Sequence, residues 1–343
     1  MVGSGETLNW CQEIGSFSGV IPCCMFHRSL FLLFFLPIGF VTLAQKPPTT
    51  SFQVVPLGVK GGIDESNLSA YLLAPQGTND FICLDAGTIH AGIEKAVQNQ
   101  TFKVGSETVL KDYIKAYLIS HAHLDHLSGL IINSTEDAKK PIYGMSACID
   151  VLKNNYFNWK SWPNLANEGD APALSKYRYT VLAPNTETPI ESTGMSVRMF
   201  PLSHGMAYQS AAFLIKNGPN YMLYLGDTGP DLIEKSRNLS QLWQAIQPLI
   251  LSKSLKAIFI EVSYPNEQPD NQLYGHLTPN WLMHELTALG KLTGANALSG
   301  FPLVITHIKP AGSNEATIKK QLQEANALNV KLIFPEQGKP LSF

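Results

Sequence analysis

Residues 121–126 have the sequence His-Ala-His-Leu-Asp-His, in which four of the six side chains are potential metal ligands. The chain contains nine histidines, and three of them fall within this run. Packing alone does not require such a concentration of imidazole and carboxylate groups. Ligands at this spacing can surround two metal ions, and a water shared between two ions is acidified to hydroxide near neutral pH. The run therefore predicts a metal-dependent hydrolase.

Three further residues of ligand type follow apolar strands elsewhere in the chain. His204, Asp227 and His307 each come one or two residues after a predicted strand. Taken singly, each is compatible with an ordinary loop residue or a capping carboxylate. Because all three lie just beyond strand ends, we expect them to join the 121–126 run at one edge of a sheet.

The composition of the 343-residue chain, with 45% hydrophobic residues, is that of a globular protein. Its 25 basic and 27 acidic residues leave a net charge of −2. Proteins that bind nucleic acid through the phosphate backbone carry an excess of positive charge. The charge balance therefore argues against a nucleic-acid partner. The length is compatible with one large α/β domain or with two smaller ones.

The first 44 residues differ from the rest of the chain. Met25-Phe-His-Arg28 precedes a short apolar run that is interrupted at Pro37 and ends in the small residue Ala44. A basic start, an apolar core and a small residue at the end are typical of a secretory signal peptide. We therefore predict a start at Met25, cleavage after Ala44, and a single domain over 45–343.

The alternative is an uncleaved N-terminal membrane anchor. The run is short for a membrane span, and no cluster of charges follows it as a stop-transfer signal. We therefore expect an exported protein, periplasmic or secreted, without a stable membrane anchor. Only Cys83 and Cys148 would remain after cleavage. Although an exported protein can bridge two cysteines, we interpret both as buried, small apolar residues.

Short apolar strands alternate with helical patterns from residue 51 onward. The predicted strands cover 52–57, 71–74, 81–84, 116–119, 196–202, 212–215, 221–225, 257–260, 302–306 and 332–334. The predicted helices cover 127–132, 240–249, 278–289 and 314–328, and one more passes through Ile93 and Ala96. The segment 155–178 is irregular and rich in aromatic residues. It is either an insertion that packs its own aromatic rings or a lid over a pocket.

The ligand pattern resembles that of the metallo-β-lactamase superfamily. The longer run 121–134, HAHLDHLSGLIINS, resembles more narrowly the class II cyclic-nucleotide phosphodiesterases. Further blocks that resemble this family are DAGT at 85–88, EVSYPN at 261–266, GHLTP at 275–279 and THIKP at 306–310. Thr135 departs from the small residue or proline expected there, but it lies outside the ligand set. The resemblance implies an αβ/βα four-layer sandwich, in which two mixed sheets are covered by outer helices.

The resemblance also implies a ligand set for two divalent ions, with Zn²⁺ expected and Mn²⁺ or Fe²⁺ as alternatives. One ion would be held by His121, His123 and His204. The second would be held by Asp125, His126 and His307, and Asp227 would bridge the two. Asp85 would orient a ligand histidine from behind.

Glu261 and His276 form a further candidate pair. Glu261 ends a buried strand, where a carboxylate without a partner is costly. His276 precedes Leu-Thr-Pro, a typical helix start with Thr278 as the cap. Related phosphodiesterases of the superfamily carry a comparable pair near the leaving group. We hypothesise that His276, held by Glu261, protonates the departing oxygen, and the alternative is a structural loop histidine. Asp125, Glu261 and His276 are therefore the predicted catalytic residues.

The function implied by the resemblance is hydrolysis of a 3′,5′-cyclic nucleotide, with cyclic AMP as the expected substrate, to the 5′-monophosphate. A metal-bridging hydroxide would attack phosphorus. Alternatives within the superfamily are a lactonase, a lactamase, another phosphodiesterase or an RNA-processing nuclease. The charge balance and the predicted signal peptide argue against the nuclease. A non-catalytic, metal-dependent nucleotide-binding protein is the alternative from another class.

Overall fold

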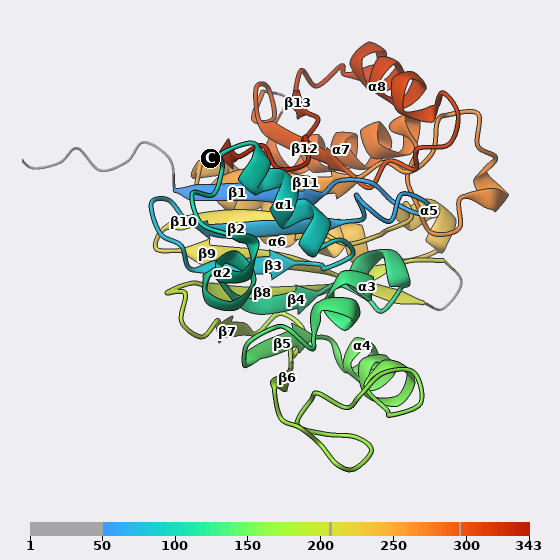
Figure 1. Ribbon diagram of the computed structural model, residues 1–343. Helices are drawn as coiled ribbons and strands as arrows, with labels where there is room; N and C mark the ends of the chain where they lie inside the picture. The colour runs from blue at the N-terminus through green and yellow to red at the C-terminus, as the bar shows by residue number, and fades with distance from the viewer. Residues whose placement is uncertain (1–50, 206–207, 295) are drawn as a thin grey trace, which may run out of the picture. The chain divides into compact units, whose positions relative to one another are not determined.

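Two mixed β-sheets of seven strands each build the fold (Figure 1). The first sheet has the spatial order β14 (Leu341–Ser342), β1 (Phe52–Gly58), β2 (Ala70–Pro75), β3 (Phe81–Leu84), β4 (Ile114–Ile119), β5 (Lys140–Gly144) and β6 (Tyr177–Val181). The second has the order β13 (Lys331–Ile333), β12 (Pro302–Thr306), β11 (Leu255–Glu261), β10 (Asn220–Leu225), β9 (Gln209–Asn217), β8 (Ser196–Ser203) and β7 (Glu187–Pro189).

This computed structural model describes residues 51–343 except 206, 207 and 295. The predicted leader and signal peptide at 1–44 lie outside the described residues. The α-helices are α1 (His90–Gln98), α2 (Ser106–Thr108), α3 (Leu124–Asn133), α4 (Ser146–Val151), α5 (Asp231–Glu234), α6 (Asn238–Leu251), α7 (Pro279–Thr293) and α8 (Asn314–Ala325). Short π-helical turns at Val109–Tyr113 and Leu152–Tyr156 and a 3₁₀ turn at Asp270–Gln272 complete the list. Within the described part of the chain, no helix is long and apolar enough to span a bilayer.

Strand β10 illustrates why both faces of a sheet are covered. Successive side chains of a strand point to opposite faces. Met222 and Tyr224 belong to the core shared with the first sheet, whereas Leu223 and Leu225 belong to the core beneath α6 and α7. Across the space between the sheets, Tyr71 of β2 packs its ring 5.8 Å from that of Tyr224. The order helix, sheet, sheet, helix is the predicted αβ/βα sandwich.

Strand direction places the candidate ligands at one edge. Strands β3 to β6 run parallel in the first sheet, and β10 to β13 run parallel in the second. Strand β8 is antiparallel to β9, which is antiparallel to β10, so β8 and β10 point the same way. The carboxyl ends of β4, β8, β10 and β12 precede the four groups of predicted ligands.

The predicted elements all occur, with some shifted ends. Helix α3 begins at Leu124, earlier than predicted, so Asp125 and His126 lie in its first turn. Helix α8 ends at Ala325, earlier than predicted. The side chain of Asn326 bonds the backbone of Val330 at 2.8 and 3.0 Å and turns the chain there.

The cysteines and the aromatic segment have structural roles. Cys83 and Cys148 are both buried and free, as interpreted from the sequence. In the aromatic segment, Phe157 is fully buried, and Trp162 Nε1 donates to Ser134 Oγ at 3.0 Å. Tyr156 reaches the Ala122 carbonyl in the histidine run at 3.3 Å. Part of the segment is therefore packed against the core and supports the loop after β4.

Candidate metal centre

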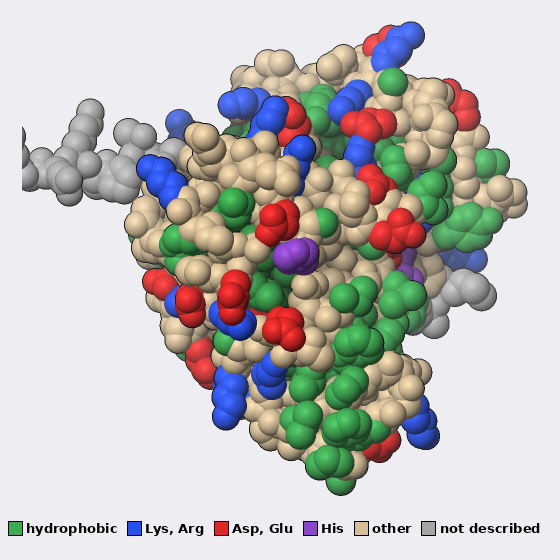
Figure 2. Space-filling model, in the orientation of Figure 1, with side chains coloured by type: hydrophobic (Ala, Val, Ile, Leu, Met, Phe, Trp, Pro, Cys, Tyr) green, Lys and Arg blue, Asp and Glu red, His purple; other side chains and the backbone are tan. Residues whose placement is uncertain are grey.

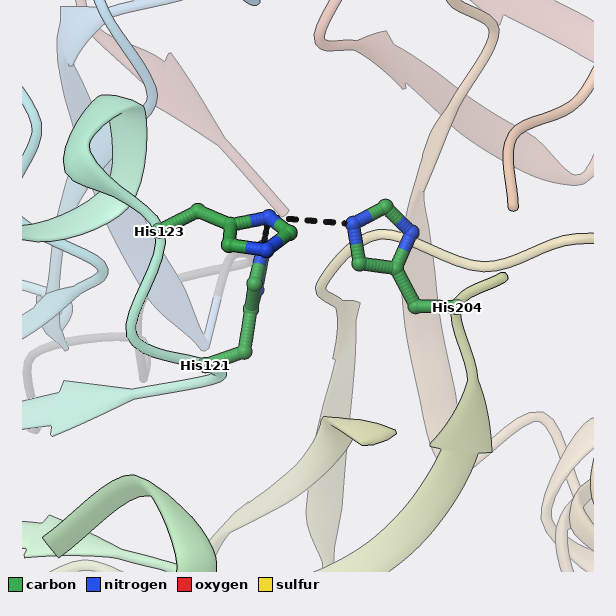
Figure 3. A group of neighbouring side chains, drawn as sticks. All are labelled: His121, His123 and His204. Atoms are coloured by element: carbon green, nitrogen blue, oxygen red, sulfur yellow. Dashed lines mark hydrogen bonds between the residues drawn. The ribbon is translucent and has the colours of Figure 1, made fainter. Parts of the chain in front are cut away.

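The loop after β4 and the end of β8 bring together the imidazoles of His121, His123 and His204 (Figure 3). His123 Nδ1 lies 3.1 Å from His121 Nε2 and 3.2 Å from His204 Nε2. In Figure 3 the three rings meet across the gap between the loop and the strand. His121 and His204 are buried, whereas His123 is exposed. These are the three residues that we predicted for one metal ion.

Helix α3 and the end of β12 supply a second triad, Asp125, His126 and His307. Asp125 Oδ2 lies 3.1 Å from His307 Nε2 and accepts a hydrogen bond from the backbone N–H of Gly62 at 3.0 Å. In each triad the ligand atoms lie within 4.8 Å of one another. Each triad is therefore compact enough to bind one cation.

Asp227 lies between the two triads. Its Oδ2 is 3.2 Å from His126 Nε2 and 3.4 Å from His307 Nε2. The same oxygen is 3.7 Å from Nε2 of both His121 and His204. A single carboxylate oxygen thus faces imidazoles of both sets, as the predicted bridging role requires.

The chemistry of the donor atoms fits a divalent metal. His126 Nδ1 donates to Asp85 at 2.8 Å, and His204 Nδ1 donates to the Gly275 carbonyl at 2.9 Å. In a neutral imidazole these bonds leave Nε2 as the metal-binding atom. Nε2 of His126 is buried and makes no hydrogen bond, although it faces Asp227. A buried, unpaired nitrogen among carboxylate oxygens is the environment that a cation satisfies.

Asp85 supports this arrangement from the end of β3. It is fully buried and accepts four hydrogen bonds, from the Ser120 backbone N–H, Ser120 Oγ, His126 Nδ1 and the Tyr224 hydroxyl, at 2.6–2.8 Å. Its φ of 53° lies in the left-handed region, which is unfavourable for residues other than glycine. Its four hydrogen bonds hold it in that conformation.

Glu261 and His276 are paired, as the sequence suggested. His276 Nδ1 donates to Glu261 Oε1 at 2.8 Å, and both residues are buried. The Thr228 backbone N–H also donates to Glu261 Oε1, at 3.1 Å, and Ser263 Oγ donates to Oε2 at 2.6 Å. His276 Nδ1 lies 3.8 Å from Asp227 Oδ2, so the pair adjoins the ligand cluster.

Comparison with known proteins identifies the family. The family described as cAMP phosphodiesterases class-II matches residues 49–338. An Aliivibrio fischeri protein named 3′,5′-cyclic-nucleotide phosphodiesterase is 44% identical over 336 residues, which cover 93% of this chain and 100% of that protein. A Yersinia pestis protein named probable 3′,5′-cyclic-nucleotide phosphodiesterase is 39% identical over 310 residues, covering 86% and 90%.

The chain belongs to the class II cyclic-nucleotide phosphodiesterases. The resemblance noted in the sequence and the enzyme class that it implied are thereby confirmed.

Solved structures agree with the predicted fold. The structure of unliganded yeast PDE1 has a TM-score of 0.77 and 25% identity, and the match covers 86% of this chain and 100% of that one. YhfI of Bacillus subtilis, a metallo-β-lactamase fold protein, has a TM-score of 0.58 at 16% identity, covering 85% and 100%. At that identity the second match shows the fold alone. The metallo-β-lactamase type of sandwich is confirmed for this class II phosphodiesterase.

Burial and neighbouring imidazoles lower the pKa of two histidines of this phosphodiesterase, whereas neighbouring carboxylates raise the pKa of a third. Burial and then His204 lower the pKa of His123 to about 4. Burial and then His126 lower the pKa of His121 well below its usual value. Burial also opposes charge on His126, but Asp227 and Asp85 outweigh it and raise the pKa of that ring. In the metal-free centre, protonation is therefore favoured at His126 over His121 and His123.

Several residues of the site were not predicted. Tyr208 stacks its ring on His123, with centroids 4.6 Å apart and planes at 12°. Lys309, for which the sequence left open a phosphate contact or a solvated loop charge, places Nζ 5.2 Å from the centre of the Tyr264 ring. The Tyr224 hydroxyl reaches Asp85 from the second sheet. Tyr224 lies in an apolar strand, so the sequence gives no signal of this contact, because burial alone explains a tyrosine there.

Proposed function

We propose that this phosphodiesterase hydrolyses 3′,5′-cyclic AMP, or a related cyclic nucleotide, to the nucleoside 5′-monophosphate at a centre of two divalent ions. The observation that carries the proposal is the convergence of the two triads on Asp227 Oδ2. The names of the Aliivibrio fischeri and Yersinia pestis relatives support the substrate class.

The proposed ligands fall into two sets, one for each ion. His121, His123 and His204 would hold one ion, and Asp125, His126 and His307 the other, with Asp227 shared. Zn²⁺ suits this set of imidazoles and carboxylates, with Mn²⁺ and Fe²⁺ as alternatives. When bound, two such ions supply a water of lowered pKa and offset the charge of the phosphoryl group.

The Glu261–His276 pair supplies the proton. Glu261 Oε1 accepts from His276 Nδ1, which fixes the ring and leaves Nε2 for the substrate. As a water-derived oxygen bonds to phosphorus, the bond from phosphorus to the 3′ oxygen breaks. The 3′ oxygen then takes the proton from His276 Nε2, so the products are the 5′-phosphate and a free 3′-hydroxyl.

The partner in this proposal is a small molecule, and no nucleic acid is expected. On the face shown in Figure 2, basic and acidic side chains lie interspersed. This distribution agrees with the balanced composition and with a substrate held by the metal centre instead of by a basic surface.

The variant His276→Ala tests the assignment of the acid. We expect it to retain both ions and to lose about 10²–10⁴-fold in kcat for cyclic AMP, since the leaving oxygen then departs without its acid. The matched control is His284→Ala, because His284 is an exposed histidine of α7. Metal content and initial rates are measured with cyclic AMP, cyclic GMP, a 2′,3′-cyclic nucleotide and a model lactone.

Each outcome of that panel separates the proposal from its alternatives. Turnover of the lactone alone would contradict the cyclic nucleotide as substrate. Bound metal and bound nucleotide without turnover would indicate a binding protein. Unchanged turnover in His276→Ala would contradict the role of His276 as the acid. The metal centre would then act without it.

We propose further that the chain is exported and that its mature form begins at Gln45. The basic, apolar and small-residue pattern of residues 25–44 supports this. N-terminal sequencing of protein recovered from the periplasm or medium of an expressing bacterium should give Gln45 first. A chain that keeps its apolar run and stays with the membrane would contradict cleavage.

A further inference from the structure

Two buried serines, Ser120 and Ser263, have matching environments in the two sheets. Ser120 directly follows β4 in the first sheet, and Ser263 follows the end of β11 in the second by two residues. Neither side chain is exposed to solvent. Each hydroxyl lies between a buried carboxylate and the Nδ1 atom of a proposed metal ligand.

In the first sheet, Ser120 connects Asp85 to His121. Ser120 Oγ lies 2.8 Å from Asp85 Oδ2 and 3.0 Å from His121 Nδ1. The hydroxyl has one proton, and a carboxylate can only accept. Ser120 therefore donates to Asp85 and accepts from the Nδ1–H of His121. His121 Nε2 then carries a lone pair toward His123 and Asp227.

In the second sheet, Ser263 connects Glu261 to His307. Ser263 Oγ lies 2.6 Å from Glu261 Oε2 and 2.9 Å from His307 Nδ1. Ser263 Oγ also lies 3.1 Å from the His307 carbonyl oxygen, a second possible acceptor. Because the carboxylate is charged and nearer, Ser263 donates its one proton to Glu261 and accepts from the Nδ1–H of His307. His307 Nε2 is then unprotonated and faces two carboxylate oxygens, at 3.1 and 3.4 Å.

The same scheme thus occurs twice. Asp85 holds His126 directly and His121 through Ser120, while Glu261 holds His276 directly and His307 through Ser263. Glu261, His276 and His307 also form a group that could by itself hold a metal. Ser263 Oγ lies 2.6–3.2 Å from a polar atom of each of these three residues. Its hydroxyl therefore already occupies the position between them.

We propose that Ser120 and Ser263 are positioning residues, one for each metal ion. Each hydroxyl links a buried carboxylate to the Nδ1 atom of His121 or His307 and so fixes the orientation of the ring. The same hydrogen bond keeps the ring in the tautomer that binds metal through Nε2. Groups that orient ligands in this way commonly change metal affinity by about 10- to 100-fold. The inference rests on the proposed function in one respect, that the centre holds two ions.

The test is metal binding by the full chain after metal removal, with Zn²⁺ and then Co²⁺ in competition with a coloured chelator. We expect Ser120→Ala and Ser263→Ala each to weaken the binding of one of the two ions by about tenfold or more. The binding of the other ion should be unchanged. The double variant should weaken both. Ser120→Thr and Ser263→Thr, which keep the hydroxyl, should restore affinity to near the wild-type value.

Ser210→Ala is the matched control. Ser210 is a fully buried serine of β9 whose Oγ has no hydrogen-bond partner among the described residues. Its variant should bind both ions like wild type. Melting temperatures of the metal-free variants show whether each one folds.

Three results would overturn the positioning role of Ser120 and Ser263: wild-type metal affinity in both alanine variants, an equal loss of affinity in Ser210→Ala, or an equal loss in the folded threonine variants. Failure of the wild-type chain to bind two ions would instead overturn the proposed dinuclear centre. The two ideas can therefore fail separately.

Discussion

At the scale of single residues, both ring nitrogens of the proposed ligand His126 face a buried carboxylate. Its Nδ1 is bonded to Asp85, and its Nε2 faces Asp227 without a hydrogen bond. Asp227 and Asp85 outweigh the effect of burial and raise the pKa of His126 well above its ordinary value. The raised pKa favours the protonated ring in the metal-free protein, so a metal ion that binds at Nε2 competes with a proton.

This raised pKa predicts the pH dependence of metal binding. A ligand that is protonated when free releases its proton on binding, so metal affinity rises as pH rises and falls as pH falls. We expect a change of about tenfold per pH unit around neutrality if one proton is released. Chelator competition between about pH 6 and pH 8 measures it. An affinity independent of pH over that range would contradict the protonation of His126.

Some residues of the site could be predicted from the sequence, and others could not. The ligand histidines and carboxylates stand out, because ionisable groups directly after apolar strands have few structural explanations. Ser120, Ser263 and Tyr224 do not, because hydroxyl groups are common in buried strands and loops. Their roles depend on which strands become neighbours, and spacing along the chain does not contain that information.

At the scale of elements, a glycine allows helix α3 to lie close to the loop after β3. A Cβ at Gly129 would lie 2.8 Å from both the Ala86 carbonyl oxygen and the Ile89 backbone nitrogen. The backbones are tied there, since Gly129 N–H donates to the Gly87 carbonyl at 2.9 Å. Any added side chain must push the helix away. Asp125 and His126 lie in the first turn of that helix.

Gly129→Ala should therefore weaken both the fold and the second triad. We expect the free energy of unfolding to fall by about 1–3 kcal/mol and the affinity for one metal ion to fall with it. Denaturant unfolding and metal titration measure the two effects. The matched control is Gly290→Ala in α7, where a Cβ would make only ordinary contacts of 3.5 and 3.8 Å.

The control should be neutral or should stabilise the helix by about 0.5–1 kcal/mol, because alanine favours helix. Equal destabilisation by both substitutions would show that the close approach at Gly129 has no special effect.

Strands β5, β7 and β14 were missed in the sequence for two physical reasons. Strand β5 begins with Lys140, a charged residue that argues against a buried strand. Lys140 is buried because Asp137, which also accepts from the hydroxyls of Tyr117 and Tyr177, neutralises it at 2.6 Å. The three-residue strand β7 and the two-residue strand β14 are too short for any periodicity. Long, apolar strands and amphipathic helices were predictable.

At the scale of the whole molecule, the two sheets contribute complementary halves of the centre. The first sheet supplies His121, His123, Asp125 and His126 from the loop and helix after β4. The second supplies His204, Asp227 and His307 after β8, β10 and β12. The site exists only when the sheets pack face to face, so the fold and the centre form together. Metal binding should accordingly stabilise the packed sandwich.

In the proposed mechanism, two ions at this junction promote hydrolysis of a 3′,5′-cyclic phosphodiester. The most direct test is the rate at which the metal-free full chain, reloaded with defined amounts of Zn²⁺ or Mn²⁺, converts 3′,5′-cyclic AMP to product. The rate should rise with bound metal, level off at two ions per chain, and yield only 5′-AMP. A chain that holds two ions and leaves cyclic AMP intact, or that releases 3′-AMP, would contradict the claim.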